Sequence, residues 1–182
     1  MQESASIFAY HQMLVLFAGA VCLFGTWVGM RHFARARARA TAGCFMASVG
    51  TGAALWASTF ISVLALDPSL NSGFEPEATG VVLIIGIVAC LLGFEIGSRH
   101  TTLAPELGGL VMGVGILAMH FIGLKAWHFA GTTQWNAYGV AMTFVLGLGL
   151  SALSVSRANR PVTRYCRHGA AIVLAFMICT MH

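Results

Sequence analysis

The sequence of 182 residues has very little charge. Only 9% of its residues are Asp, Glu, Lys or Arg, and 58% are hydrophobic, whereas about a quarter of the residues are charged in a typical soluble domain. The mean hydropathy is +0.81. A chain with so few charges cannot cover a soluble fold with a polar surface, so the composition excludes a soluble protein. We expect the chain to fold in a lipid bilayer and to bind no nucleic acid.

Catalytic and disulfide signatures are also missing. The sequence contains no nucleotide-binding loop, no paired nucleophile and base, and no pair of carboxylates. We therefore expect no enzymatic activity from this chain, and any enzymatic output should lie in another domain. A disulfide framework is not expected either, because the five cysteines are scattered in or next to apolar segments. They are Cys22, Cys44, Cys90, Cys166 and Cys179.

Apolar runs predict an all-α fold, a polytopic bundle of transmembrane helices. A helix needs about 20 apolar residues to cross a bilayer, and five of the runs are long enough. The sixth, of about 14 residues, is too short to span ~30 Å at ~1.5 Å per residue, so we expect it to be truncated. The six helices are expected at about residues 13–30, 41–66, 80–98, 107–128, 137–156 and 169–182.

The arginines are distributed on one side of this predicted bundle. All nine follow the first, third or fifth apolar run, whereas the opposite side has Lys125 as its one basic residue, together with acids that include Glu3. Cytoplasmic loops of membrane proteins are enriched in Lys and Arg. We therefore predict that the arginine-rich loops are cytoplasmic and that the N-terminus lies outside.

A motif recurs along the chain at nearly constant spacing. Thr59 and His120 are 61 residues apart, and His120 and His182 are 62 apart. Repetition of this kind predicts repeated structural units. We interpret residues 1–182 as one domain of three two-helix repeats, at about 10–66, 74–128 and 135–182. The recurring pairs are Ser58-Thr59, Met119-His120 and Met181-His182.

His120 lies deep in an apolar segment, where a histidine is unfavourable unless it has a partner. With the predicted orientation it lies ~20 Å from the inner face, in the outer third of the bilayer. Gly113 precedes it by seven residues and shares its helical face, and Gly109 lies one turn earlier. Small residues at this spacing allow helices to approach closely. We therefore expect His120 to face the inside of the bundle.

Histidines and methionines at one depth of the bundle predict a metal site. Imidazole and thioether groups together suit copper, and a Cys three residues from a His on one helix could join them. We predict one copper ion near the outer face, with Ser58 and Thr59 only lining the site because hydroxyls are poor ligands for a soft cation. The candidate ligands are His120, Met119, His182, Met181, His11 and Cys179.

Other interpretations of the same residues remain open. Each Met could simply fill the apolar core, and His120 could form only hydrogen bonds between helices. A haem group could be held by two axial histidines among His11, His120 and His182. The bundle could also be a metal transporter or channel.

Three stretches resemble the MHYT domain, a bacterial integral-membrane sensor module: residues 56–61 (Trp-Ala-Ser-Thr-Phe-Ile), residues 119–124 (Met-His-Phe-Ile-Gly-Leu) and the terminal Met181-His182. The resemblance implies an input domain of the bacterial inner membrane that senses oxygen, CO or NO through copper. It assigns Met119, His120, Met181 and His182 as ligands. It also implies a cytoplasmic output that makes or degrades cyclic-di-GMP. A seventh helix and this output domain are expected beyond residue 182.

Overall fold

The computed structural model describes residues 2–36, 42–65, 72–129, 135–163 and 165–181, and within these ranges it contains six α-helices and one pair of short strands. The prediction of an all-α fold is confirmed. The helices are α1 (Gln2–Ala36), α2 (Ala42–Leu64), α3 (Pro76–Gly97), α4 (Ala104–Lys125), α5 (Ala137–Asn159) and α6 (Cys166–Cys179). The strands are β1 (Ser72–Phe74) and β2 (Trp127–Phe129).

Five of these helices are long and apolar enough to cross a membrane. The candidate spans lie within α1 to α5, whereas α6 is apolar but has only 14 residues. The chain is therefore a multi-pass membrane protein, as its composition predicted. The spans are Tyr10–Ala34, Gly43–Leu64, Pro76–Gly97, Ala104–Lys125 and Ala137–Asn159.

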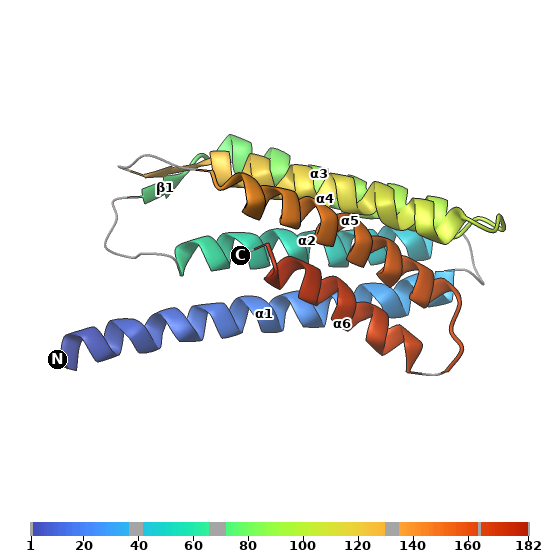
Figure 1. Ribbon diagram of the computed structural model, residues 1–182, viewed down its shortest axis with the longest axis horizontal. Helices are drawn as coiled ribbons and strands as arrows, with labels where there is room; N and C mark the ends of the chain where they lie inside the picture. The colour runs from blue at the N-terminus through green and yellow to red at the C-terminus, as the bar shows by residue number, and fades with distance from the viewer. Residues whose placement is uncertain (1, 37–41, 66–71, 130–134, 164, 182) are drawn as a thin grey trace.

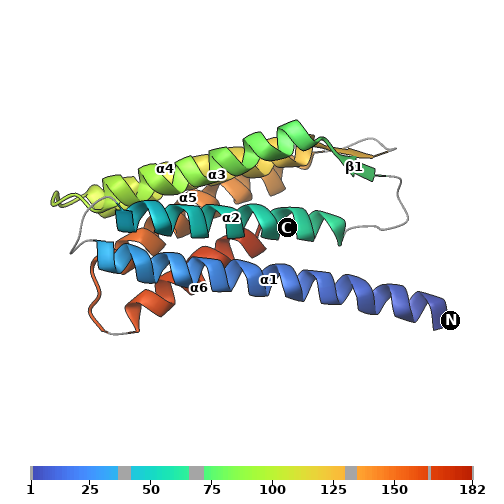
Figure 2. The same cartoon turned by 180° about the vertical axis from the view of Figure 1, so that it is seen from behind.

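The helices form a closed ring. Each helix packs against the next one in the chain, and α6 returns to pack against α1. In Figures 1 and 2, α1 and α6 lie along one side of the bundle, and α3, α4 and α5 lie along the other. One end of the ring carries the arginine-rich connections, and the opposite end carries β1 and β2. We call these the arginine end and the strand end.

Adjacent glycines allow α4 to approach both of its neighbours. A Cβ atom on Gly108 would lie 2.5 Å from the backbone nitrogen and 2.7 Å from the Cα of Gly97 on α3. A Cβ atom on Gly109 would lie 2.5 Å from the Cα of Ala152 on α5. Gly113, one turn further along, also faces α5. The close helix contact expected of Gly109 and Gly113 is confirmed.

Several helix boundaries differ from the expected ones, and two of them are instructive. α1 begins at Gln2 rather than near residue 13, because a helix can continue through polar residues that lie outside the apolar span. α4 ends at Lys125 rather than near residue 128, because Ala126 caps the helix and β2 begins at Trp127. In both cases apolarity located the span but did not locate the ends of the helix.

The pair of strands was not predicted. β1 and β2 pair antiparallel, with Gly73 opposite His128 and Phe74 opposite Trp127. The Phe74 ring also meets the ring of Phe60 on α2 edge-on, with their centroids 4.8 Å apart. The paired segments are more than fifty residues apart in the chain. They become neighbours only because α2, α3 and α4 pack side by side, which no local sequence pattern reveals.

The Gly108→Ala substitution should destabilise the bundle. The added methyl group would press on the backbone of α3, and overpacking of this kind costs about 1–3 kcal/mol. The matched control is Gly149→Ala on α5, where a Cβ atom meets nothing within 4 Å. Thermal unfolding of the purified protein in detergent measures both effects. If the two variants unfold at the same temperature, the close approach of α3 and α4 is wrong.

Candidate functional site

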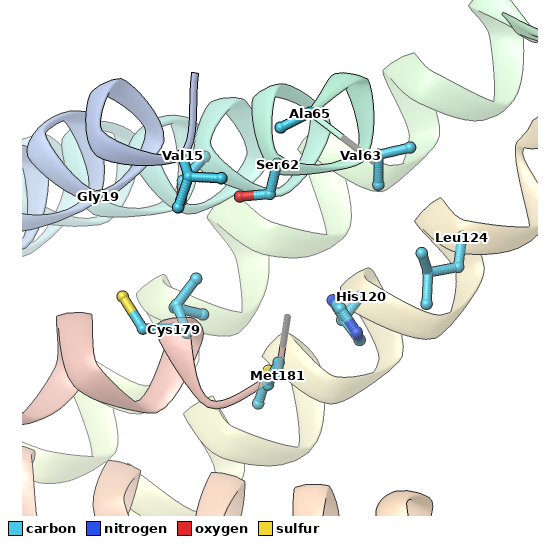
Figure 3. A pocket seen from close by; sticks show the side chains of 11 residues that line it. Val15, Gly19, Ser62, Val63, Ala65, His120, Leu124, Cys179 and Met181 are labelled. Atoms are coloured by element: carbon cyan, nitrogen blue, oxygen red, sulfur yellow. The ribbon is translucent and has the colours of Figure 1, made fainter. Parts of the chain in front are cut away.

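A cavity of about 300 Å³ lies inside the ring, toward the strand end (Figure 3). Four helices line it, and α4 and α6 supply the nitrogen and sulfur atoms. The rest of the lining is apolar or carries a hydroxyl group. The polar and sulfur-containing residues are Ser58 and Ser62 of α2, His120 of α4, and Cys179 and Met181 at the end of α6.

His120 is almost completely buried, with 4% of its surface exposed. Its imidazole meets the ring of Phe121 edge-on, with the centroids 5.4 Å apart. Because His120 also lines the cavity, the side chain points into the bundle, which is the orientation expected from its spacing to Gly113.

Met181 and Cys179 bring sulfur atoms to the same cavity from α6. Figure 3 shows Met181 on the same side of the cavity as His120, whereas the sulfur of Cys179 points away from the imidazole. The methyl end of Met181 reaches α5, because a Cβ atom on Gly147 would lie 3.0 Å from its Cε. Met181 therefore extends from the cavity lining to the neighbouring helix.

Met119 and His11 do not line this cavity. Met119 is fully buried but faces α3, and a Cβ atom on Gly86 would lie 2.6 Å from its Sδ. Consecutive residues on a helix point about 100° apart, so Met119 and His120 face different neighbours. His11 lies half-buried on α1, and its Nε2 has no hydrogen-bond partner among the residues that the structure describes. His182 lies outside the described residues.

Helix α2 contributes hydroxyl groups rather than ligands to the cavity. Thr59, the residue equivalent to His120 in the repeat, donates its hydroxyl hydrogen bond to the carbonyl of Leu55 in its own helix at 3.0 Å. The cavity is lined instead by Ser58 and by Ser62. Ser62 is a residue that the sequence analysis missed. Its position one helical turn after Ser58 could have revealed it.

The types of donor atom at the cavity fit copper. An imidazole, a thioether and a thiol are borderline or soft ligands, whereas Ca²⁺ and Mg²⁺ prefer oxygen. Among the described residues there is no group of three or more His, Cys, Asp or Glu side chains that could hold a metal ion. A copper site here would therefore depend on the thioether of Met181 in addition to His120.

Comparison with known proteins gives a family and two relatives. Residues 113–171 match the MHYT family model, described as a bacterial signalling protein N-terminal repeat. Over 172 residues the chain is 32% identical to an uncharacterized signaling protein of Caulobacter vibrioides, covering 91% of this chain and 21% of that protein. Over 139 residues it is 27% identical to the cyclic di-GMP phosphodiesterase NbdA of Pseudomonas aeruginosa, covering 72% of this chain and 18% of that protein.

The chain thus spans about a fifth of the length of the curated relatives that it matches. No solved structure matches it. The matched segment begins at Gly113, includes the buried His120 and continues through α5 into the start of α6. The resemblance seen in the sequence is therefore confirmed over residues 113–171, which match the repeat found in MHYT signalling proteins.

Proposed function

We propose that the chain is the membrane-embedded input domain of a signalling protein, and that it senses a diatomic gas or a change of redox state through copper at the His120 cavity. The observation that carries the proposal is the position of His120 on α4 and of Met181 just beyond the end of α6, because both line one cavity inside the ring. Both residues belong to Met-His pairs of the repeated motif. Bound copper would supply a soft cation that binds small diatomic ligands and changes oxidation state.

The lining residues prepare such a site in three ways. The neutral imidazole of His120 offers a nitrogen lone pair, and the thioether of Met181 offers sulfur. Val15 and Ile178 shield the cavity with apolar surface, and the hydroxyls of Ser58 and Ser62 could donate hydrogen bonds to a small polar ligand. The protein thereby provides soft ligands, a largely apolar lining and two hydroxyl groups.

A signal can arise because the two ligands lie on helices that are not neighbours in the ring. α4 packs against α3 and α5, whereas α6 packs against α5 and α1. A group shared by His120 and Met181 would connect α4 to α6 across the interior. A change in that connection would move α6 relative to α4, and both helices begin at the arginine end.

The output of this signal would lie in another domain. Both relatives extend far beyond the matched region, and one of them is named as a cyclic di-GMP phosphodiesterase. We infer a cytoplasmic output domain of the same type for this protein. Haem held by His11 and His120 together is less well supported, because His11 does not line the cavity with His120.

Copper content should depend on His120 and on Met181, but not on Met119. His120→Ala removes the buried imidazole and should abolish copper binding, and Met181→Leu should weaken it by about tenfold or more. Met119→Leu is the matched control, because this neighbouring thioether faces α3. Elemental analysis of the purified protein, with electron paramagnetic resonance of the oxidised form, measures the copper content and its ligands. We expect one copper ion per chain.

Three results would contradict this assignment. Wild-type copper content in His120→Ala would place the metal elsewhere. Equal losses in Met119→Leu and Met181→Leu would show that the methionines act through general packing. A copper content of two per chain would also be incompatible with a single site at this cavity.

The orientation in the membrane can be tested at exposed residues of the two ends. The described arginines lie at the arginine end, while Glu75, Glu77 and Lys125 lie at the strand end. In a background without the native cysteines, Glu77→Cys should react with an impermeant thiol reagent added to intact cells, and Thr101→Cys should react only after lysis. Labelling of Thr101→Cys in intact cells would reverse the proposed orientation.

A further inference from the structure

Two adjoining cavities lie between α1 and α6 at the arginine end, away from the His120 cavity. The smaller, about 250 Å³, is lined by Met30, Arg31 and Arg167, together with Trp27 and His168. The larger, about 450 Å³, is lined by Trp27 and His168 and otherwise by apolar residues. Because both cavities share Trp27 and His168, they form one groove with a basic end and an apolar remainder. We call it the α1–α6 groove.

Trp27 fixes the protonation pattern of His168. Its indole Nε1 donates a hydrogen bond to His168 Nδ1 at 3.0 Å, and the two rings stack with centroids 6.3 Å apart. An indole nitrogen can only donate, so His168 Nδ1 must accept and cannot carry a proton. The proton of the imidazole therefore lies on Nε2. His168 thus keeps a hydrogen-bond donor for a ligand in the groove.

Trp27 also positions the first of two guanidinium groups. The guanidinium carbon of Arg31 lies 4.7 Å from the centre of the indole ring, a cation–π contact. Arg167 enters the same cavity from the first turn of α6. Among the described residues that line the groove, none is acidic. Two guanidinium groups and one N–H donor therefore converge without a carboxylate beside them.

The basic residues of the groove lie close to the N-terminal end of α6, which is unfavourable unless an anion is bound there. The N-terminal end of a helix carries the positive end of the helix dipole, which favours acidic residues. The first turn of α6 has no acidic residue and instead contains Arg167 and His168. A bound phosphate group would offset both the dipole and the two arginines, and Arg is well suited to phosphate.

We propose that the α1–α6 groove binds one molecule of an anionic phospholipid. Its phosphate would lie between Arg31, Arg167 and His168. One acyl chain would extend along the apolar part, which runs for about 10 Å along α1 from Trp27 to Ala20. This part is open to the bilayer, since Phe24 is 66% exposed and Ile172 is 57% exposed. Basic pockets between helices at the cytoplasmic surface are suited to anionic headgroups.

Charge and shape together favour a lipid over other occupants. A free phosphate would use only the basic end and leave the apolar part unexplained, and a zwitterionic lipid would not need two arginines. The proposed molecule would join α1 to α6 at the seam that closes the ring. The proposal is independent of copper, because none of the groove residues lines the His120 cavity.

Native mass spectrometry of the full-length protein can test the headgroup contacts. Phosphatidylglycerol and phosphatidylcholine with identical acyl chains would be offered together, and phosphatidylglycerol should be retained in preference. Arg31→Gln and Arg167→Gln should each reduce this retention about fivefold. Arg157→Gln, an exposed arginine at the same end of the bundle that does not line the groove, is the charge-matched control and should have no effect.

A second measurement tests the acyl chain. Phosphatidylglycerol brominated on its acyl chains should quench the fluorescence of Trp27, and Trp27→Phe should remove that part of the quenching. Ala20→Leu leaves the charge unchanged but fills the apolar part, so it should lower both the quenching and the lipid retention. Inorganic phosphate should not displace the lipid.

Four outcomes would overturn the proposal. Equal retention of the two lipids would show no selection for the anionic headgroup. An Arg157→Gln effect as large as that of Arg31→Gln would show only general attraction to charge. Displacement by inorganic phosphate alone would indicate a phosphate site rather than a lipid site. Absence of bound phosphatidylglycerol in the wild-type protein would show that the groove does not hold an anionic lipid.

Discussion

The hydrocarbon core of a bilayer cannot form hydrogen bonds, and this constraint governs the membrane-spanning helices. Backbone groups are satisfied inside the helices, and many hydroxyl side chains bond to carbonyls of their own helix. Thr26 donates to the carbonyl of Cys22 at 2.9 Å, and Ser48 donates to that of Cys44 at 2.6 Å. A side chain that cannot be satisfied in this way must face the interior of the ring. His120 is therefore placed by the same constraint that forms the helices.

Close packing through glycine then decides what His120 faces. Gly108 and Gly109 bring α4 against α3 and α5 at once, which fixes the rotation of α4 about its axis. With that rotation fixed, Met119 packs on α3 while His120 opens to the interior cavity. The end of α6 supplies Met181 from the far side of the ring. The candidate metal site thus depends on helix packing more than on the motif itself.

Helix α6 takes part in both proposed sites. Its first turn carries the basic end of the α1–α6 groove, and its last residues line the His120 cavity. The helix has 14 residues, so the two sites lie within about 20 Å of each other along it. A rigid helix of this length transmits a shift from one end to the other. Lipid bound in the α1–α6 groove could therefore influence the position of Met181.

The sequence by itself determined the solvent, the helices and the helical face of the motif. Long apolar runs with few charges form helices in any bilayer, and the spacing of Gly113 to His120 places both on one helical face. These properties are local, because they depend on composition and on the 3.6-residue period. The ends of α1 and α4 were less predictable. α1 extends beyond its apolar span into polar residues, and α4 ends earlier than expected because β2 follows it and pairs with β1.

Only the tertiary structure decided which residues meet. The pairing of β1 with β2, the separation of Met119 from the cavity, and the hydrogen bond from Trp27 to His168 across 141 residues all follow from which helices are neighbours and how each is rotated. Which helices are neighbours and how each is rotated depends on small residues that contact another helix, such as Gly108 and Gly109. The residues that they contact are distant in the chain. The physical reason is that close packing is a property of two surfaces together, whereas a sequence pattern describes each surface alone.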